Sequence, residues 1–236
     1  MMAPTDAEMA GASRIKWGAL LGTLGLVLAI AGVFIIILDV GFAVGGGITS
    51  TANFQTILNT IFAAVGAILA GVVLALLSFV LYTLGFASLR RADSRFTVPM
   101  VLCVIGLIGL LLLIGFAGLY AASINSALGC GPSDTICQNS ATSLPAGAGA
   151  LLWVGGLVAL VGLIGAILGI WRFGGRYQSG VAKAGAILYI IPVLAIIAPI
   201  LVLIGAHQVQ KRMSRARASM SAPMMPPMGI PPPPSA

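Results

Sequence analysis

Five apolar stretches, each long enough to cross a lipid bilayer as a helix, divide this chain of 236 residues. A hydrocarbon core about 30 Å thick needs roughly 20 apolar residues, because a helix rises about 1.5 Å per residue. The stretches are approximately residues 17–40, 57–86, 98–121, 148–170 and 184–206. Continuous apolar runs favour helices over the alternating strands of a membrane barrel, since a helix satisfies its own backbone hydrogen bonds. The sequence therefore predicts an all-α integral membrane bundle with about five transmembrane helices.

The scarcity of charge excludes a soluble domain. Only 7% of the residues are charged and 59% are hydrophobic, whereas a soluble domain carries about 25% charged residues. We expect a cytoplasmic N-terminal segment (1–16), a transmembrane domain (17–206) and a tail (207–236) that is first basic and then proline-rich and disordered. Four consecutive prolines favour an extended conformation. A solvated tail is the expectation, and a docking segment for a partner with an aromatic groove is the alternative.

The basic residues orient the predicted helices. The net charge is +7, but every basic residue flanks an apolar run, which is typical of helix anchors and not of a nucleic-acid-binding face. The N-terminal segment and the connections at 89–96 and 171–183 hold eight of them, whereas the connections at 41–56 and 122–147 hold none. The excess of positive charge on the cytoplasmic side predicts a cytoplasmic N-terminus.

The tail conflicts with this orientation. Five spans place it outside the cell, yet it carries four basic residues. One solution is that Pro192 and Pro199 break the fifth stretch into a re-entrant hairpin. We expect a full span instead, because about 23 residues match one membrane thickness. Residues 183–188 also resemble residues 16–21, as if both helices enter the membrane from the same side.

Two cysteines, Cys130 and Cys137, bracket a short polar stretch in a connection that we place outside the cell. An oxidising exterior permits a disulfide there, and closing so short a loop costs little entropy. Two free thiols or a redox or metal role are the alternatives, although the spacing is not Cys-x-x-Cys. Cys103 is expected to be a small buried hydrophobic residue.

The inventory for catalysis is thin. One histidine and five dispersed acids form no acid–base pair and no metal-ligand cluster, so we expect no enzyme, no metal and no cofactor. Asp39 is the one acid near an apolar span, and intramembrane carboxylates often mark ion or proton paths. It follows Trp17 by about 22 residues, which places it at the outer membrane boundary. We expect an interfacial residue there, with an ion or proton site as the alternative.

Glycine pairs spaced by four indicate close helix packing. The pairs are Gly18 and Gly22, Gly41 and Gly45, and Gly165 and Gly169. Small residues on one face let helix backbones approach where lipid provides no hydrophobic drive. We expect packing within the chain, with a homo-oligomer interface as the alternative. The basic and aromatic residues at 171–177 are expected to be interfacial anchors, with an anionic lipid or phosphate ligand as the alternative.

Several short motifs carry a resemblance to a known family. They are Arg14-x-Lys16 before Gly18-Ala19-Leu20-Leu21, Leu89-Arg90-Arg91 with Phe96 and Pro99, Phe173-Gly174-Gly175-Arg176-Tyr177, Lys183-Ala-Gly185-Ala186-Ile187-Leu188 with Pro192, and the proline-rich tail. Over about residues 13–205, the chain resembles archaeal multi-pass membrane proteins grouped as a domain of unknown function. The resemblance implies the plasma membrane of an archaeon and no assigned activity, so no site residue carries over from it.

These observations lead to two functional hypotheses. The first is a non-enzymatic structural or accessory component that works by helix packing, as a homo-oligomer or with a partner in an envelope complex. The second is a small transporter or channel that uses Asp39 and a fifth helix broken at Pro192 and Pro199, since discontinuous helices line many transporter sites. Both need the lipid bilayer as a partner, and neither needs nucleic acid.

Overall fold

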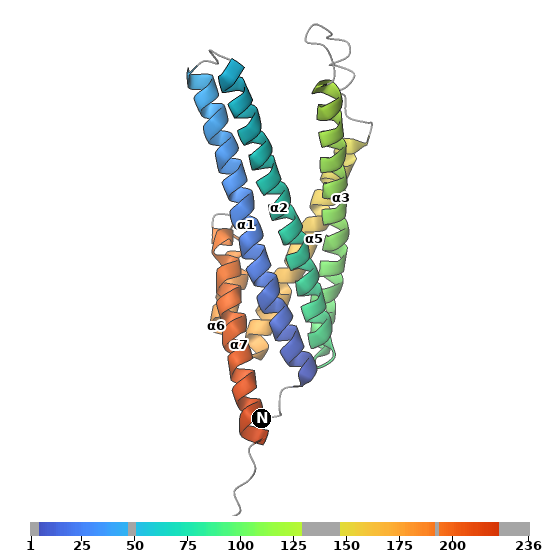
Figure 1. Ribbon diagram of the computed structural model, residues 1–236. Coiled ribbons are helices and arrows are strands. Elements are labelled where there is room, and N and C mark those ends of the chain that lie inside the picture. The colour runs from blue at the N-terminus through green and yellow to red at the C-terminus, as the bar shows by residue number, and fades with distance from the viewer. Residues whose placement is uncertain (1–4, 47–50, 129–146, 192–193, 222–236) are drawn as a thin grey trace, which may run out of the picture.

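The computed structural model describes residues 5–46, 51–128, 147–191 and 194–221. Within these ranges, every regular element is helical. The elements are α1 (Asp6–Gly46), α2 (Thr51–Arg90), the short 3-10 helix η1 (Ser94–Phe96), α3 (Thr97–Leu128), α5 (Ala148–Arg176), α6 (Gly180–Leu188), the 3-10 helix η2 (Leu194–Ile196) and α7 (Ala198–Ser221). Four of the described helices, α1, α2, α3 and α5, are long and apolar enough to cross a membrane. The predicted all-α membrane fold is confirmed (Figure 1).

Small residues spaced by seven form the seam between α1 and α2. They are Gly11, Gly18, Gly25 and Gly32 on α1, and Ala64, Gly71, Ser78 and Gly85 on α2. A Cβ atom added to Gly25 would lie 2.7 Å from the carbonyl oxygen of Gly71, and the Ser78 hydroxyl donates a hydrogen bond to the Gly18 carbonyl at 2.7 Å. A seven-residue repeat keeps one helix face against its partner in a left-handed pair. The two helices therefore form a long antiparallel hairpin.

The backbones of α3 and α5 approach each other as closely as those of α1 and α2. A Cβ atom on either Gly106 or Gly162 would overlap the Cα atom of the other, and one on Gly109 would overlap the backbone of Ala159. These backbones can approach so closely only because both surfaces lack side chains.

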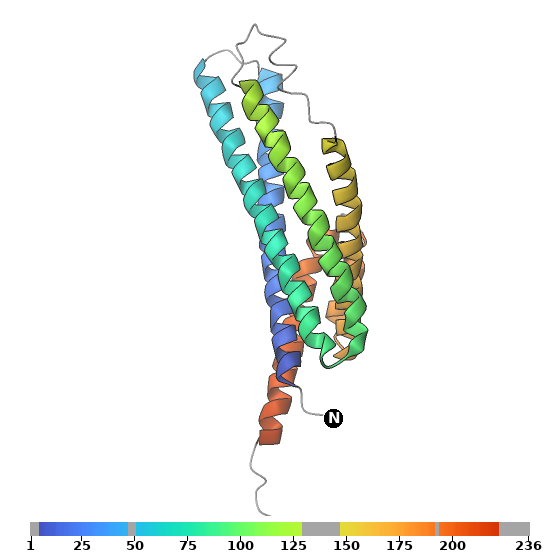
Figure 2. The same cartoon turned by 90° about the vertical axis from the view of Figure 1, so that its right-hand side faces the viewer.

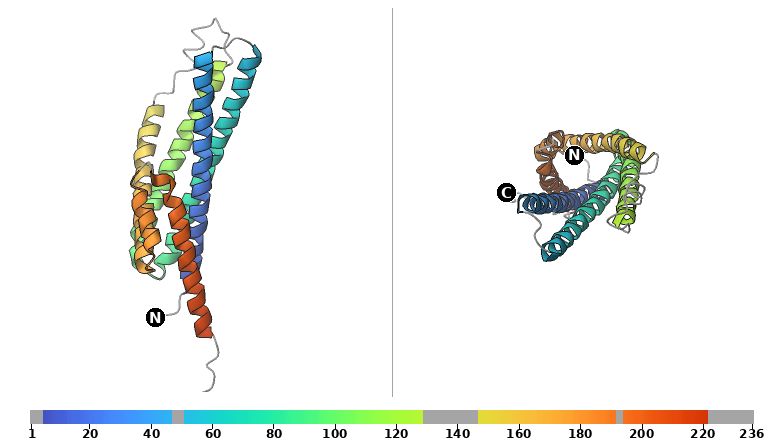
Figure 3. Two further views of the ribbon diagram at one scale, coloured as in Figure 1. Left: turned by 90° about the vertical axis from the view of Figure 1, so that its left-hand side faces the viewer. Right: turned by 90° about the horizontal axis from the view of Figure 1, so that it is seen from above.

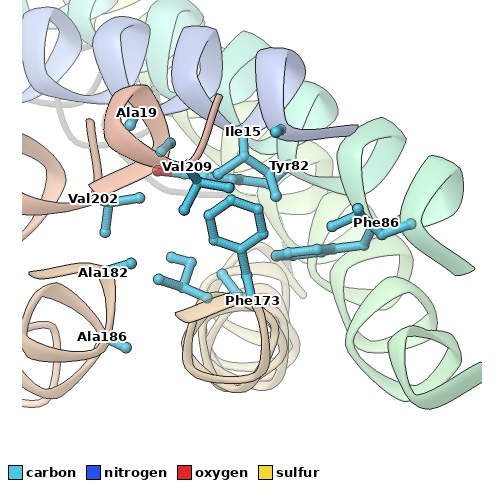
Figure 4. Close-up of a cluster of buried hydrophobic side chains, with 14 of the residues drawn as sticks. Ile15, Ala19, Tyr82, Phe86, Phe173, Ala182, Ala186, Val202 and Val209 are labelled. Atoms are coloured by element: carbon cyan, nitrogen blue, oxygen red, sulfur yellow. The ribbon is translucent and has the colours of Figure 1, made fainter. Parts of the chain in front are cut away.

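The two hairpins join at one end and diverge at the other. Figure 1 shows α1 and α2 leaning away from α3 and α5 toward the end of the bundle opposite the N-terminus, and Figure 2 shows the same four helices from the side. Among the described residues, the cluster of buried hydrophobic side chains lies at the joined end. In Figure 4, the Phe173 ring of α5 points between Ile15 and Val209. Phe86 stacks between two further rings of this core, with centroid distances of 6.3 Å to Tyr82 and 6.2 Å to Phe96.

The fifth apolar stretch does not form one spanning helix. The helix α6 ends at Leu188, and α7 begins at Ala198 and returns antiparallel to it, with Gly185 against Val202 and Gly205 against Ala182. Nine residues of α6 rise only about 14 Å, half the hydrocarbon thickness. The fifth span predicted over 184–206 is therefore not confirmed, because the stretch is divided between α6 and α7, which form a hairpin beside the joined end of the bundle (Figure 3).

Proline and small residues explain this return. Pro199, the second residue of α7, lacks an N–H group and therefore suits a helix start, whereas Pro192 lies outside the described residues. Residues 183–188 do enter from the same end as residues 16–21, as their similarity implied, but α6 stops halfway.

The basic half of the predicted tail is helical and packs on α1. The helix α7 continues to Ser221, so the boundary expected at residue 207 falls inside it, and residues 222–236 lie outside the described part. Val209 and Met213 are buried, and Arg217 pairs with Asp6 of α1 at 2.6 Å. This contact places the end of α7 at the same end of the bundle as the start of α1, whereas five full spans would place the two ends apart. All twelve lysines and arginines lie toward the end of the bundle that holds the start of α1 and the end of α7.

This topology predicts which positions share a membrane side. In a background with all three cysteines replaced, Ser94→Cys in η1 and Ser219→Cys in α7 should react with a membrane-impermeant maleimide from the same side. Gly149→Cys, at the start of α5, is the opposite-end control. Mass-tag labelling of sealed and inverted vesicles measures this, and labelling of positions 94 and 219 from opposite sides would contradict the hairpin.

Candidate functional site

The hairpin of α6 and α7 borders one side of an open pocket of about 300 Å³ between the helices of the bundle. Residues from α1, α2, α5 and both ends of the hairpin turn line it: Gly22, Gly25, Leu26, Ala29, Gly71, Val72, Ala75, Ser78, Phe79, Tyr82, Leu163, Ala166, Tyr189 and Pro199. Apart from one serine and two tyrosines, these residues are apolar. The glycines and alanines at the seam create the space, because larger side chains would fill it. The volume suits a small ligand.

Tyr82 supplies the unusual polar group of this cavity. Its side chain is buried, with 4% of its surface exposed, and its hydroxyl has no hydrogen-bond partner among the described residues. The Tyr189 hydroxyl is its polar neighbour and interacts with it, although the two groups do not meet in ideal hydrogen-bond geometry. The Ser78 hydroxyl, by contrast, already donates to the Gly18 carbonyl. A buried hydroxyl without a partner costs about 1–3 kcal/mol, so a ligand with a hydrogen-bonding group would be stabilised here.

A second polar centre lies at the basic end, where Arg176 of α5 joins three segments. Its guanidinium donates to Glu8 of α1 and to Asp93 of the α2–η1 connection, both at 2.8 Å. The Tyr177 hydroxyl donates to the same Glu8 oxygen at 3.0 Å. Glu8 in turn accepts from the backbone N–H of Thr5 at 2.9 Å, the capping-box arrangement that starts α1. This cluster ties the helix ends together.

In this cluster, the pKa values of Asp93 and Tyr177, which lie outside the candidate spans, are shifted from their ordinary values. The backbone N–H of Arg95 and the Arg176 guanidinium favour the ionised form of Asp93 and lower the pKa of that carboxyl. Burial, together with the nearby Glu8 carboxylate, raises the pKa of the Tyr177 phenol. At neutral pH, Asp93 is therefore ionised and Tyr177 is protonated, so Tyr177 remains a hydrogen-bond donor.

The structure gathers some of the residues singled out from the sequence and leaves others apart. Gly18 and Gly22 face Ser78, Gly165 faces Leu102 and Cys103, and Gly169 faces the Phe86 ring. All of these contacts lie within the chain. Pro199 lines the cavity.

Several other predicted positions are not part of the described site. The helix α1 passes through Asp39, Gly41 and Gly45, but the surroundings of these residues lie outside the described part. Asp39 is 33 residues along α1 from Asp6, about 50 Å from the basic end. Cys130 and Cys137 also lie outside the described residues, so the disulfide stays a prediction. Within the described ranges, no three histidine, cysteine or acidic side chains gather as a metal site would require.

Sequence reasoning missed Tyr82, Glu8 and the seven-residue glycine spacing. The Thr5-x-x-Glu8 pattern before an apolar run is a readable capping signal, and the spacing of Gly11, Gly18, Gly25 and Gly32 predicts one continuous helix face. Nothing in the sequence marks Tyr82, because its significance arises from the missing partner and from the hairpin beside it.

Together these features define an integral helical membrane protein with four candidate spans among the described helices and a helical hairpin, α6 and α7, beside an open pocket. Residues 8–233 match a family model described as "Protein of unknown function (DUF973)", and the chain belongs to this family. The predicted resemblance to a domain of unknown function is confirmed, while the archaeal origin stays a prediction. No curated protein and no solved structure matches the chain.

Proposed function

We propose that this protein is a non-enzymatic membrane transporter that binds a small, mostly apolar molecule inside the bilayer. One observation carries the proposal: the buried Tyr82 hydroxyl, whose polar neighbour among the described residues is Tyr189 and which lacks a hydrogen bond of ideal geometry, lies in a pocket beside the turn of the α6–α7 hairpin. Helices interrupted near the bilayer midplane commonly form transporter substrate sites. The apolar lining favours an apolar substrate body, and Tyr82 favours one hydrogen-bond acceptor on it. This version of the transporter hypothesis needs no role for Asp39.

We infer that the basic end faces the cytoplasm of the plasma membrane. Because the hairpin returns α7 to the N-terminal end, all twelve lysines and arginines support one orientation. The excess of positive charge on the cytoplasmic side of membrane proteins then favours cytoplasmic placement of both helix ends.

Removing the Tyr82 hydroxyl tests the cavity. Tyr82→Phe keeps the ring and its stacking on Phe86 but removes the unsatisfied group. In detergent, stripped of small molecules, the variant should melt at a temperature equal to or above that of the wild type, because the wild type loses about 1–3 kcal/mol to the buried hydroxyl. The second measurement is mass spectrometry of organic extracts of the protein purified from its own membrane. A small molecule that co-purifies with the wild type should be depleted about fivefold in the variant. This factor corresponds to the loss of one net hydrogen bond of about 1 kcal/mol.

Thr83→Val is the matched control. It removes a hydroxyl at the next residue, which bonds the Phe79 carbonyl of its own helix at 2.9 Å and does not line the cavity. The control should keep the co-purified molecule. Proteoliposomes loaded with that molecule should release it faster when they contain the wild type than when they contain Tyr82→Phe. A lower melting temperature for Tyr82→Phe with an unchanged extract would contradict the proposal.

An accessory or oligomer-forming role is the second candidate. It rests on glycines other than the pairs spaced by four that the sequence singled out. A Cβ atom on Gly66, Gly115, Gly118 or Gly156 would meet no atom within 4 Å, so these small residues are not used in the described packing. Such faces favour helix association between chains. Native mass spectra of the gently extracted protein report its oligomeric mass and any foreign subunit, and a monomer without companions would count against this role.

A further inference from the structure

A separate pocket of about 390 Å³ opens at the basic end, between the α2–η1 connection, the end of α5 and the start of α6. Its lining residues are Asp93, Arg95, Phe96, Trp171, Arg172, Gly175, Arg176 and Lys183. It shares none of them with the cavity beside Tyr82. Four cations and one carboxylate line the same small space.

The carboxylates of Glu8 and Asp93 neutralise only part of this positive charge. Arg176 is held by Glu8 and Asp93, and Arg172 donates to the backbone carbonyl of Arg95. Among the described residues, no carboxylate forms an ion pair with the side chains of Arg95, Arg172 or Lys183. Arg95 interacts with the Asp93 carboxylate only at longer range, and these three cations around one pocket favour an anionic ligand with several acceptor oxygens.

The chain holds Lys183 in place at this pocket. The Ser179 side chain caps α6 by accepting from the backbone N–H of Ala182, which fixes the first turn containing Lys183. The stem of Lys183 lies over Gly174, where an added Cβ atom would come within 2.7 Å of its Cγ atom. Its ammonium lies 5.7 Å from the centre of the Trp171 ring. Gly174, Trp171 and the Ser179 cap therefore position the Lys183 ammonium, which has no ion-paired carboxylate among the described residues.

The residues around the pocket are of the types found at the depth of lipid headgroups. Trp171 belongs to the last turns of a spanning helix and is 44% exposed. Exposed tryptophan beside lysine and arginine is typical of the membrane–water interface, and basic pockets between helices at this level bind anionic headgroups.

We propose that this pocket binds a phosphate ester group at the membrane surface. Arg95, Arg172 and Lys183 donate to its oxygens, while Arg176 and Asp93 form the fixed floor. The group comes either from an anionic phospholipid, whose chains lie along the exposed face of α5, or from a free phosphate compound of the cytoplasm. The recognition chemistry is the same for both.

The test compares ligand binding to the full chain in detergent. Phosphatidylglycerol, phosphatidylcholine and inorganic phosphate are titrated separately, with lipid adducts counted by native mass spectrometry and protection followed by thermal shift. The wild type should bind phosphatidylglycerol about tenfold more tightly than phosphatidylcholine, and Arg95→Gln with Lys183→Gln should remove most of that preference. Binding of phosphatidylglycerol alone identifies a lipid as the source, whereas equal protection by inorganic phosphate identifies a free phosphate compound.

Arg212→Gln with Lys211→Gln is the control. It removes the same two charge types from the exposed surface of α7, away from the pocket, and should leave the preference unchanged. Equal loss in both double variants would assign the effect to general surface charge and overturn the proposal. Absence of any preference in the wild type for either phosphate ligand would also overturn it. Melting temperatures of both variants report whether the fold is retained.

Discussion

Replacing Gly162 by alanine should strongly destabilise the bundle. The new Cβ atom would overlap the Cα atom of Gly106 on α3, and it would also come within 3.0 Å of the Phe79 ring. Backbone cannot move aside as a flexible side chain can, so α3 and α5 must separate. Overpacking typically costs about 1–3 kcal/mol, and we expect the upper end of this range. The measurement is thermal unfolding in detergent, followed by tryptophan fluorescence.

Gly156→Ala is the control for this prediction. The position lies six residues earlier on the same helix, and an added Cβ atom there would meet no atom within 4 Å. Alanine is favoured over glycine in a helix interior by about 1 kcal/mol, so this variant should melt at or above the wild-type temperature. Similar melting temperatures for the two variants would contradict the close α3–α5 contact.

Replacing Arg176 by glutamine should produce the second large effect. The change leaves Glu8, whose side chain is only 10% exposed, and Asp93, at 19%, without their cation. Removing one partner of a buried pair costs about 3–5 kcal/mol, but Arg176 itself is 34% exposed. Solvent screening therefore reduces the expected loss to about 1–3 kcal/mol. Arg91→Gln removes the same charge from an exposed position that has no ion pair among the described residues, and should change stability little.

The pH dependence supplies an independent readout of the same cluster. Because the folded state lowers the pKa of Asp93, its contribution to stability is present above the pKa of the unfolded carboxyl and is lost as the pH falls through the lower folded value. Acidification from pH 6 to pH 3 should therefore lower the melting temperature of the wild type more than that of Arg176→Gln. An identical acid response of both proteins would show that Arg176 does not stabilise the ionised carboxyl.

The membrane class and most helices could be predicted from the sequence. Apolar runs with so few charges must satisfy their backbone hydrogen bonds internally, so the helices confirmed at α1, α2, α3 and α5 follow from local composition. Their described ends extend past the apolar stretches, from Asp6 in α1 to Arg176 in α5, because a capped helix continues into polar residues where side chains such as Glu8 satisfy its first turn.

The candidate sites could be predicted only in part. The basic and aromatic residues at 171–177 indicated an interfacial anchor with a phosphate ligand as an alternative, and this segment lines the basic pocket. The partners of those residues come from far along the chain, as Arg176 reaches Glu8 across 168 positions. No periodicity or spacing encodes such a pairing.

The sequence by itself determined that this protein is helical, lies in a membrane and carries its basic residues between apolar runs. Those properties depend on local sequence alone, because apolar side chains are stable in lipid and a helix satisfies its own backbone hydrogen bonds there. The tertiary structure alone decided that residues 184–206 turn back halfway. The same apolar composition suits a span or a hairpin, and the packing of Gly185 on Val202 and of Gly205 on Ala182 distinguishes them. That return creates the cavity beside Tyr82 and brings all the basic residues to one end, because it reverses the direction of α7.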